Sequence, residues 1–425
     1  MAINLKKISF NQFYPIIYLT PLFAIFLSVF YFFGTNELID SGGDGWKYIQ
    51  FAENLLNGFY ADKSGEIGFL WYGPGYPFLL SFLIFFKSSF FSIKLFNCIL
   101  YILASIILFS AYKISFSPKT AIFFTYLTCL VHPYFRIAIS TIMSEAFSFF
   151  CVTCLLYIYL KIIKKQSFKF ILLFSLIGCW LVLTKVFFAY VFIAAFFISI
   201  LFIRKNILFL KLSLFPLIFC IPYLVYTFNL TSKIFYWTDS GGNNLYCMST
   251  PYNDEVGEWF YTGADGFENL KDDKYVSNIY YNHKDFFNTI KMLSVNGVEY
   301  DQALKKKAIQ NIVSYPNKYL KNITFNVSRL FTNFPRVIGH EFSIFKIPNI
   351  FLFVLIFWLL ILSSYDVLIL NPNINNTPIL IFTLIFIFGF SLVAAYQRYL
   401  FPIIPLIIYI ISPTILKLKK TFQNP

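Results

Sequence analysis

Two carboxylates in the stretch "DSGGDGWKYIQFAENLLNG" (40–58) could carry out acid–base chemistry. Asp40 and Asp44 follow a long apolar run and precede a short amphipathic segment (45–57), after which Gly58 is a typical helix stop. A carboxylate at this position can act as a general base. It can equally be an N-cap, because Asp is a preferred residue at helix starts. Spacing alone leaves both interpretations of Asp44 open, and Asp40 could be an ordinary loop residue.

A third carboxylate, Glu145, begins the apolar run in "STIMSEAFSFFCVTCLLYIYL" (140–160). An acid in the first turn of a helix is electrostatically favourable, with Ser144 as a plausible cap. An acid at the edge of a bilayer is nevertheless costly, and it indicates a functional site. If Asp44 and Glu145 meet the same aqueous boundary, the sequence supports a metal or acid–base site about as well as it supports two unrelated caps.

Two cations complete the set of candidate groups. Lys185 lies in "LVLTKVFFAY" (181–190), between two apolar runs, and Arg398 lies in "AAYQRYLFPIIP" (394–405), at the start of the last run. For an isolated residue the ordinary explanation is a snorkelling anchor. A cleft with acids on one side and cations on the other would suit a phosphate on a lipid tail. Arg398 could bind that phosphate in bidentate fashion, and Lys185 could add charge.

The three histidines give little support for a metal centre. His132, which precedes a proline, is expected to be structural. His340, next to Glu341, could ligate a metal at the outer boundary, and Glu145 is the other candidate ligand. No complete ligand set, Walker loop, dinucleotide-binding glycine pattern or Gly-x-Ser-x-Gly motif is present.

The composition is that of a polytopic helical membrane protein. Hydrophobic residues make up 58% of the chain and charged residues 13%, and apolar runs near the length of a bilayer recur throughout. The first run, 13–33, is too long for a signal peptide and is expected to be a retained anchor. Lys and Arg account for the net charge of +14 but lie mostly at the ends of apolar runs. This pattern indicates membrane orientation, and no nucleic-acid partner is expected. Of the 7 Cys, six lie within apolar runs, so no disulfide framework follows.

The positions of the lysines predict which loops face outward. Lys6 and Lys7 place the N-terminus in the cytoplasm and the 40–58 stretch outside. The positive-inside rule holds for the later clusters only if 76–86 is a juxtamembrane helix rather than a crossing. Lys87 and Lys94 are then exceptions. About ten crossings follow, near 13–33, 95–112, 121–139, 145–160, 169–184, 187–203, 208–228, 348–364, 377–395 and 399–416.

The predicted organisation has three parts. Residues 1–229 form a transmembrane catalytic module that includes the first outer loop (34–94), residues 230–346 form an extracytoplasmic loop domain, and residues 347–425 form C-terminal transmembrane helices. A helical period across 300–331 is broken at Pro316, which predicts two helices. Tripeptides that begin at Asn229, Asn322 and Asn326 match the N-glycosylation acceptor pattern.

Taken together, the order and spacing of the motifs resemble those of lipid-linked-sugar glycosyltransferases of the C fold. The resemblance is greatest to bacterial relatives of the dolichyl-phosphate-mannose protein mannosyltransferases. The sequence departs from the pattern of that family at two positions: Tyr72 stands where a basic residue is frequent, and Lys185 replaces the usual Arg. The segments that carry it are Asp44 with Tyr48 and "AENLLNG", "WYGPGYPFLLSFLIF" (71–85), "MSEAFSFF" (143–150), "WLVLTKVFFAY" (180–190), "DSGGNNLYCMSTPYNDEVGEW" (239–259), "KKKAIQNIVSYPNKYLKN" (305–322) and "RYLFPIIP" (398–405).

This resemblance implies an all-α C-fold enzyme of the bacterial inner (cell) membrane, with its active site on the extracytoplasmic side. Asp44 would be catalytic, and Glu145 a catalytic or metal-linked acid. Arg398 would contact the lipid phosphate, with Lys185 in support. The expected substrate contacts are Tyr48, Tyr72, Tyr76 and Asp40. The only cofactor considered is a divalent metal, with Glu145 and His340 as candidate ligands.

The predicted reaction is transfer of a sugar, with inversion, from a polyprenyl-phosphate carrier to a hydroxyl of a glycan, lipid or protein acceptor. Two alternatives remain: a transporter or flippase of lipid-linked sugars, and a polymerase or ligase of the O-antigen type that uses diphosphate-linked glycans. Transporters usually have inverted repeats and a site at the bilayer midplane. The sequence has no such repeat, and its polar candidates gather at one boundary.

Overall fold

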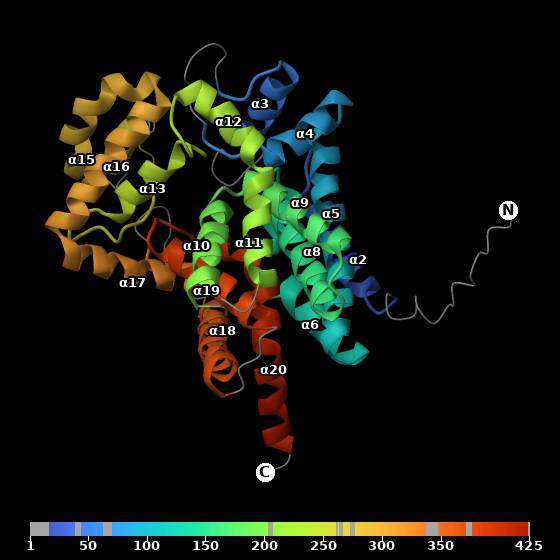
Figure 1. Ribbon diagram of the computed structural model, residues 1–425. Coiled ribbons are helices and arrows are strands. Elements are labelled where there is room, and N and C mark those ends of the chain that lie inside the picture. The colour runs from blue at the N-terminus through green and yellow to red at the C-terminus, as the bar shows by residue number, and fades with distance from the viewer. Residues whose placement is uncertain are drawn as a thin grey trace.

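The computed structural model describes residues 17–38, 44–62, 70–202, 207–260, 262, 267–272, 277–336, 347–370 and 376–423. These residues form helices and loops and contain no β-strand, which confirms the predicted all-α class (Figure 1). Asp40 and His340 lie outside the described residues. The roles predicted for these two side chains therefore stay predictions.

The segment that follows the first apolar helix folds into two short helices. Helix α2 (Thr20–Phe33) leads to α3 (Asp44–Leu56) and α4 (Gly75–Phe85). The helix predicted at 45–57 is confirmed as α3, and its buried face includes Ile49 and Ala52 as the pattern predicts. Trp46 and Leu56, which the pattern places on the same apolar face, are exposed. Helix α4 has 11 residues, about half the length that a perpendicular span needs. This length agrees with the juxtamembrane helix predicted at 76–86.

Lys94 explains one exception to the predicted charge distribution. The side chain is 1% exposed, and its Nζ donates hydrogen bonds to the backbone oxygens of Thr35 (3.0 Å) and Glu37 (2.6 Å). Lys94 therefore fastens the chain that leaves α2 to helix α5 (Phe90–Ser115). Because it is committed to these carbonyl groups, it is a poor indicator of membrane orientation.

The remaining apolar helices form a bundle around α8 (Glu145–Lys164), which contacts α5, α9, α20 and η6. In Figure 1, α3, α4 and α12 lie at one end of this bundle and the C-terminal end of α20 lies at the other. The other members of the bundle are α6 (Pro118–Leu130), α7 (Phe135–Ser140), α9 (Phe168–Thr184), α10 (Phe187–Phe202), α11 (Ile207–Phe219), α12 (Ile221–Thr231), α18 (Ile347–Tyr365), the π-helical η5 (Asp366–Leu370), α19 (Thr377–Ser391), η6 (Gln397–Ile403) and α20 (Ile404–Gln423).

Fewer helices are long enough to cross a membrane than the sequence predicts. Among the described residues, four helical segments are long and apolar enough to span a bilayer: 90–115, 145–164, 347–370 and 397–421. A fifth is obtained if α11 and α12, bent by 45°, count as one span. Four shorter apolar helices, α2, α9, α10 and α19, account for most of the other predicted crossings, and a fifth, α4, is the segment predicted as a juxtamembrane helix. The prediction of about ten crossings is thus not confirmed, because hydropathy marks apolar runs and does not fix helix length.

The crossing predicted at 121–139 is in fact two helices. Helix α6 ends at Leu130 and α7 begins at Phe135. Pro133 lies between them, and a proline cannot donate a backbone hydrogen bond. His132 is buried in this turn, where its Nε2 lies 3.1 Å from the backbone oxygen of Gln397 and its Nδ1 accepts from the backbone N–H of Tyr134 at 3.1 Å.

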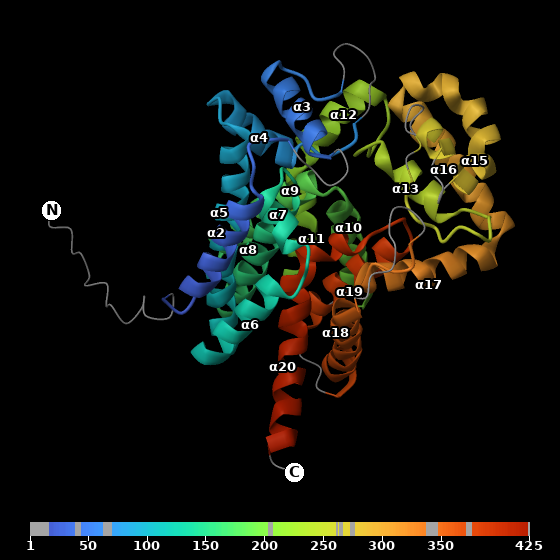
Figure 2. The same cartoon turned by 180° about the vertical axis from the view of Figure 1, so that it is seen from behind.

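The segment predicted as an extracytoplasmic loop domain has a hydrophobic cluster of its own. Its helices are α13 (Ser240–Met248), η2 (Asn269–Asp272), α15 (Ser277–Ile290), η3 (Lys291–Val295), α16 (Gly297–Ser314) and α17 (Pro316–Thr332). The cluster contains Tyr246, Phe260, Phe287 and Leu304. Figures 1 and 2 both show these helices to one side of the bundle. The break between α16 and α17 at Pro316 confirms the prediction for 300–331.

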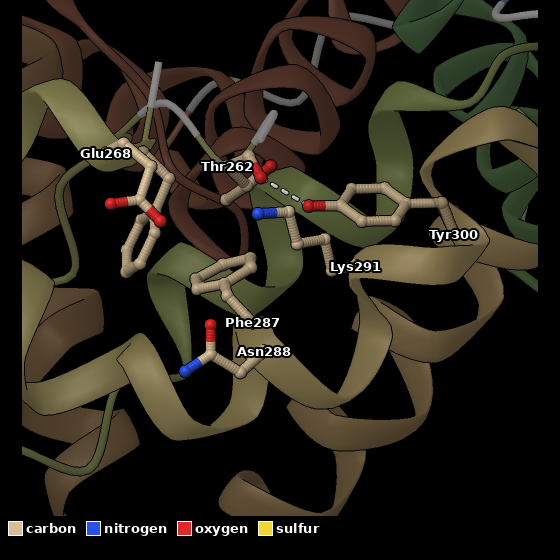
Figure 3. A pocket seen from close by; sticks show the side chains of 7 residues that line it. Thr262, Glu268, Phe287, Asn288, Lys291 and Tyr300 are labelled. Atoms are coloured by element: carbon tan, nitrogen blue, oxygen red, sulfur yellow. Dashed lines mark hydrogen bonds between the residues drawn. The ribbon is translucent and has the colours of Figure 1, made fainter. Parts of the chain in front are cut away.

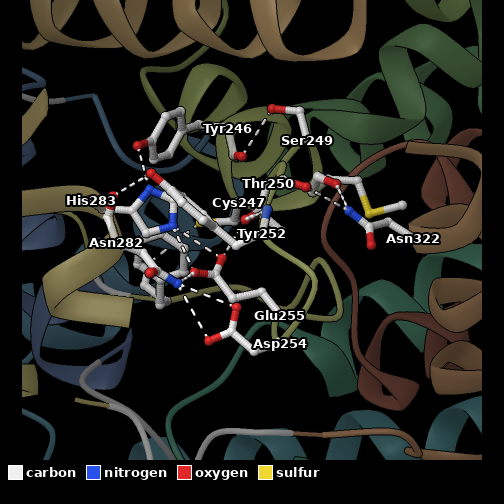
Figure 4. Close-up of polar contacts among 12 residues, drawn as sticks. Tyr246, Cys247, Ser249, Thr250, Tyr252, Asp254, Glu255, Asn282, His283 and Asn322 are labelled. Carbon is white, nitrogen blue, oxygen red and sulfur yellow. Dashed lines mark hydrogen bonds and ion pairs between the residues drawn. The ribbon is translucent and has the colours of Figure 1, made fainter. Parts of the chain in front are cut away.

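A buried polar network holds this domain together (Figure 4). The Nδ1 of His283 lies 2.7 Å from the Tyr246 hydroxyl, and its Nε2 lies 3.0 Å from Oε2 of Glu255. Asn282 donates to Glu255 at 2.8 Å, and the Thr250 hydroxyl donates to the same carboxylate. Burial alone would raise the pKa of Glu255, but these hydrogen bonds and His283 bring it below the ordinary value. His283 is therefore a core residue with both ring nitrogens engaged.

Two of the glycosylation-type tripeptides begin at buried asparagines. Asn322 and Asn326 on α17 are both 0% exposed, and their amides bind backbone groups. Neither amide nitrogen is accessible to a modifying enzyme in this fold, so the pattern at these positions has a packing explanation.

Candidate active site

Asp44, the first residue of α3, is bound by side chains from two distant parts of the chain. Its Oδ1 accepts a hydrogen bond from the Tyr72 hydroxyl at 2.7 Å. Its Oδ2 lies 3.0 Å from Nη1 of Arg398, in η6. The side chains of Asp44 and Arg398 are 18% and 22% exposed, respectively. Two predicted site residues that are separated by most of the sequence thus form a half-buried ion pair.

Glu145 and Lys185 form a second ion pair. Glu145 is the first residue of α8 and is 1% exposed, and its Oε1 lies 2.8 Å from Nζ of Lys185. Lys185 occupies the tight junction between α9 and α10. The other carboxylate oxygen of Glu145, Oε2, is buried without a hydrogen-bond partner. A buried carboxylate oxygen in this state is costly unless a further group binds it.

Tyr48 lies between the two ion pairs. Its hydroxyl is 3.0 Å from Oγ of Ser144, the residue before Glu145, and its ring lies 4.5 Å from the Tyr72 ring. Burial raises the pKa of Tyr48 well above the ordinary value, and the negative charges of Glu145 and Asp44 raise it further. Tyr48 therefore remains a neutral hydroxyl, and its contacts with Ser144 and Tyr72 link the surroundings of the two ion pairs.

Glycines allow the segment that carries Tyr72 to approach the bundle closely. A Cβ at Gly73 would lie 2.1 Å from the backbone oxygen of Leu183, and one at Gly75 would lie 2.5 Å from the Thr184 hydroxyl. Only a residue without a side chain fits at either position. This contact sets the start of α4 against the end of α9, immediately before Lys185, and so holds Tyr72 near Asp44.

Tyr76 lies deeper in the bundle than a substrate contact requires. It is 0% exposed, and its hydroxyl lies 2.9 Å from the side-chain amide nitrogen of Asn97. That amide also donates to the backbone oxygen of Thr141 at 3.0 Å. Tyr76 therefore links α4 to α5 and to the turn before α8. This placement favours packing, and substrate contact by Tyr76 stays a prediction.

The described donor groups do not by themselves form a metal site. Among the described residues no three His, Cys, Asp or Glu side chains come together. Both oxygens of Asp44 and one oxygen of Glu145 are already bound to hydroxyl or cationic partners. A divalent metal usually needs three or more protein ligands, although bound waters can replace some of them. The metal stays a prediction, and no step proposed below passes through it.

The loop domain is tied to the first outer loop at one point near the site. The backbone N–H of Leu70 donates a hydrogen bond to the Asp239 carboxylate. The backbone N–H of Asp239 donates to the backbone oxygen of Leu70 at 3.0 Å. Asp239 also accepts a hydrogen bond from the Tyr236 hydroxyl. Leu70 is only two residues before Tyr72. The sequence does not predict this contact, and the only signal for Asp239 is its place at the head of the 239–259 motif.

A second buried acid, Asp301 on α16, lies close to Asp239. Its Oδ1 accepts from the backbone N–H of Gly242 at 2.6 Å. Burial is the main cause that raises the pKa of Asp301 from 3.8 to about 7, with a smaller contribution from Asp239. Because the folded state holds this proton more tightly than the unfolded chain does, Asp301 contributes stability at low pH. That stability is lost as the pH rises through about 7.

The Asp301→Asn variant should therefore show a smaller decrease in Tm than the wild type as the pH is raised from 3.8 to about 7. Asn keeps the oxygen that accepts from Gly242 but does not titrate. The measurement is thermal unfolding in detergent across this pH range, with the exposed acid Asp285 on α15 changed to Asn as the control. Equal slopes for Asp301→Asn and the wild type would contradict the assignment.

A pocket in the loop domain lies away from these groups. It is lined by Thr262, Phe267, Glu268, Phe287, Asn288, Lys291 and Tyr300 (Figure 3). None of the predicted site residues lines it. A second pocket, between helices of the bundle, is lined almost entirely by apolar side chains. Its wall includes Val152, Leu155 and Leu156 of α8, which begins at Glu145.

Comparisons with known proteins cover both the sequence and the fold. Residues 73–226 match the family model described as dolichyl-phosphate-mannose-protein mannosyltransferase. Comparison of the sequence with curated proteins gives no significant match.

Among solved structures, the chain is similar to the Archaeoglobus fulgidus oligosaccharyltransferase AglB in complex with an inhibitory peptide and a dolichol-phosphate. The identity is 14% and the TM-score 0.48, over 98% of this chain and 52% of that one. The apo form of the same enzyme gives 12% identity and a TM-score of 0.46, over 98% and 52% of the two chains. ArnT from Cupriavidus metallidurans bound to undecaprenyl phosphate gives 12% identity and a TM-score of 0.41, over 92% of this chain and 77% of that one. The chain thus spans about half the length of the oligosaccharyltransferases that it matches.

The matched residues include Glu145 and Lys185, and also Gly73 and Gly75, which directly follow Tyr72 in the sequence. Residues 73–226 are therefore similar to the dolichyl-phosphate-mannose-protein mannosyltransferase family, in agreement with the resemblance of the sequence motifs.

Proposed function

We propose that this protein is a membrane glycosyltransferase that moves one sugar from a polyprenyl-phosphate carrier to an acceptor hydroxyl. The observation that carries the proposal is the Asp44–Arg398 ion pair, at 3.0 Å, next to the Glu145–Lys185 pair. A potential base and a potential phosphate ligand meet at one half-buried place. The family match over 73–226 supports the same reaction class.

Asp44 is the general base in this proposal. It takes the proton of the acceptor hydroxyl while that oxygen attacks the anomeric carbon of the sugar. The bond from the anomeric carbon to the phosphate oxygen breaks at the same time, and its electron pair leaves with the polyprenyl phosphate. Attack from the side opposite to the leaving group inverts the configuration. The hydrogen bond from Tyr72 holds the carboxylate in place for this step.

Arg398 stabilises the charge that develops on the leaving phosphate. Its planar guanidinium can donate two parallel hydrogen bonds to phosphate oxygens. Its Nε is buried and has no hydrogen-bond partner in the structure, and a phosphate oxygen would satisfy this donor. Charge on the phosphate grows as the bond breaks, so this interaction is stronger in the transition state than in the ground state.

The Asp44–Arg398 pair also couples donor binding to activation of the base. In the structure Arg398 occupies Oδ2 of Asp44 and Tyr72 occupies Oδ1. A donor phosphate competes with Oδ2 for the guanidinium. When Arg398 turns to the phosphate, Oδ2 becomes free to accept the hydroxyl proton of the acceptor. The acid is therefore unpaired only when a donor is in place.

The second ion pair and the apolar cavity suit other parts of the same substrate. The free Oε2 of Glu145 can accept a hydrogen bond from a sugar hydroxyl, while Lys185 adds positive charge near the phosphate. The cavity walled by Val152 and Leu155 is apolar enough for isoprene units of the carrier. The predicted orientation puts the two acids at the extracytoplasmic boundary of a bacterial inner membrane.

The test is a transfer assay on the protein in lipid nanodiscs, with a panel of radiolabelled hexoses and pentoses on polyprenyl monophosphate and on polyprenyl diphosphate. The expected result is consumption of at least one monophosphate donor, with release of free polyprenyl phosphate. Turnover of diphosphate donors alone would favour a polymerase or ligase. In vesicles, movement of intact donor across the bilayer without cleavage would favour a flippase. Either result would overturn the proposal.

A further inference from the structure

The segment that leads to Arg398 is a non-helical strap, residues 392–396, between α19 and η6. Arg398 follows it after one residue, so the strap decides where the guanidinium can reach. The apolar helix α19 ends at Ser391 and η6 begins at Gln397. Without support, five residues outside a helix would leave this position poorly defined.

Every residue of the strap is hydrogen-bonded to the loop domain. The Tyr319 hydroxyl donates to the Leu392 oxygen at 2.8 Å, and the Asn326 amide donates to the Val393 oxygen at 2.5 Å. The backbone N–H of Ala394 donates to the backbone oxygen of Asn244 at 3.2 Å. The backbone N–H of Ala395 donates to Oδ1 of Asn326 at 3.2 Å. The Tyr396 hydroxyl donates to the backbone oxygen of Trp259 at 2.9 Å. Ala394 also packs in the hydrophobic cluster of the loop domain.

Asn326 is the centre of this arrangement. Its Nδ2 donates to three backbone oxygens, those of Phe390, Ser391 and Val393, and thus binds the last carbonyls of α19 and the start of the strap. Its Oδ1 accepts from Ala395 N–H and from Nη2 of Arg329. The side chain is 0% exposed, so none of these groups can exchange its partner for water.

Arg329 joins the strap to the interior of the loop domain. Its Nε donates to the Ala395 oxygen at 3.2 Å, while Nη2 donates to the Gly257 oxygen at 3.0 Å. Nη1 binds the backbone oxygens of Val256 and Pro335, each at 3.2 Å. The guanidinium is 0% exposed, and a set of backbone oxygens from three chain segments satisfies it in place of a carboxylate.

We infer that Asn326 and Arg329 are positioning residues for Arg398: through the strap, the loop domain sets the guanidinium against Asp44 and the donor phosphate. The inference rests on the proposed function for the part that concerns the phosphate. It assigns the loop domain a role in donor binding. The sequence gives no hint of that role, because the strap and α17 are far apart in the chain.

The test compares Asn326→Ala with Asn322→Ala, a matched control on the same helix. Asn322 is also 0% exposed, but its amide donates to the backbone oxygens of Met248 and Thr250, inside the loop domain. Both variants lose a buried amide, so their stability losses should be similar by thermal unfolding. Only Asn326→Ala releases the strap.

Two readouts are measured on both variants. One is the rate at which phenylglyoxal labels Arg398, followed by peptide mass spectrometry, which needs no donor. The other is the Kd of a polyprenyl monophosphate in nanodiscs. Asn326→Ala should label Arg398 faster and bind the lipid about tenfold more weakly, the factor that corresponds to about 1.4 kcal/mol. Asn322→Ala should match the wild type in both.

The outcomes separate the inference from the proposed function. Equal labelling of Arg398 in the wild type and in Asn326→Ala would overturn the positioning role, whatever the lipid measurement gives. Faster labelling without any binding of polyprenyl phosphate by the wild type would support the positioning role and contradict the proposed function. If Asn322→Ala behaves like Asn326→Ala, the effect is a general loss of stability and the inference is wrong.

Discussion

Asp44→Asn should lower the rate of sugar transfer by about 10²–10⁴-fold, the range that a positioned general base contributes. Asn keeps the oxygen that accepts from Tyr72 but cannot remove a proton. The variant should bind polyprenyl phosphate at least as tightly as the wild type, because the carboxylate that competes for Arg398 is gone. The measurement is single-turnover transfer, together with a separate lipid-binding titration.

The matched control for this variant is Glu53→Gln, which removes an exposed acid from the same helix, α3. It should retain the wild-type rate. A wild-type rate for Asp44→Asn, with normal expression and unfolding temperature, would return Asp44 to the role of a helix-capping or structural acid. A loss of rate accompanied by an equal loss of lipid binding would also contradict the base assignment, because a base acts after the donor has bound.

Arg398→Gln should lower kcat/KM by about 10²–10³-fold, as expected when a donor to the developing charge is removed. Arg398→Lys should recover only part of this loss, because an ammonium group keeps the charge but lacks the fork that binds two oxygens. Steady-state kinetics with varied donor concentration measure both effects. The control is Arg136→Gln, which removes an exposed guanidinium that lies over the Phe33 ring.

The two variants should not be additive. The account makes Asp44 and Arg398 parts of one device, so the double variant should lose much less than the product of the two single losses. Fully multiplicative losses would mean that the two residues act independently, and would contradict the coupling of donor binding to release of the base.

Local pattern was sufficient to predict several elements. The amphipathic segment at 45–57 is α3, and Pro316 separates α16 from α17. Periodicity and proline chemistry act over a few residues, so they can be read directly from the sequence. The convergence of Asp44 and Arg398 could be expected only coarsely, from the order of crossings and the family motifs.

Tertiary contacts decided what the sequence could not. Lys185 was predicted to support a phosphate contact, and its ion pair with Glu145 was not predicted. Lys94 was counted as an outer charge, and it binds backbone oxygens inside the protein. The crossing predicted at 121–139 is broken at His132 and Pro133 into α6 and α7. The contacts of Lys185 and Lys94 depend on partners far along the chain, which a local window does not contain, whereas the break at Pro133 has a local cause.

The most direct measurement is a cryo-EM structure of the wild-type protein in nanodiscs with a polyprenyl monophosphate bound. We expect the phosphate to contact the Arg398 guanidinium, the Asp44–Arg398 distance to exceed the present 3.0 Å, and the Tyr72–Asp44 hydrogen bond to remain. The lipid tail should enter the cavity beside Val152 and Leu155. A phosphate bound elsewhere, with the Asp44–Arg398 pair intact, would contradict the account.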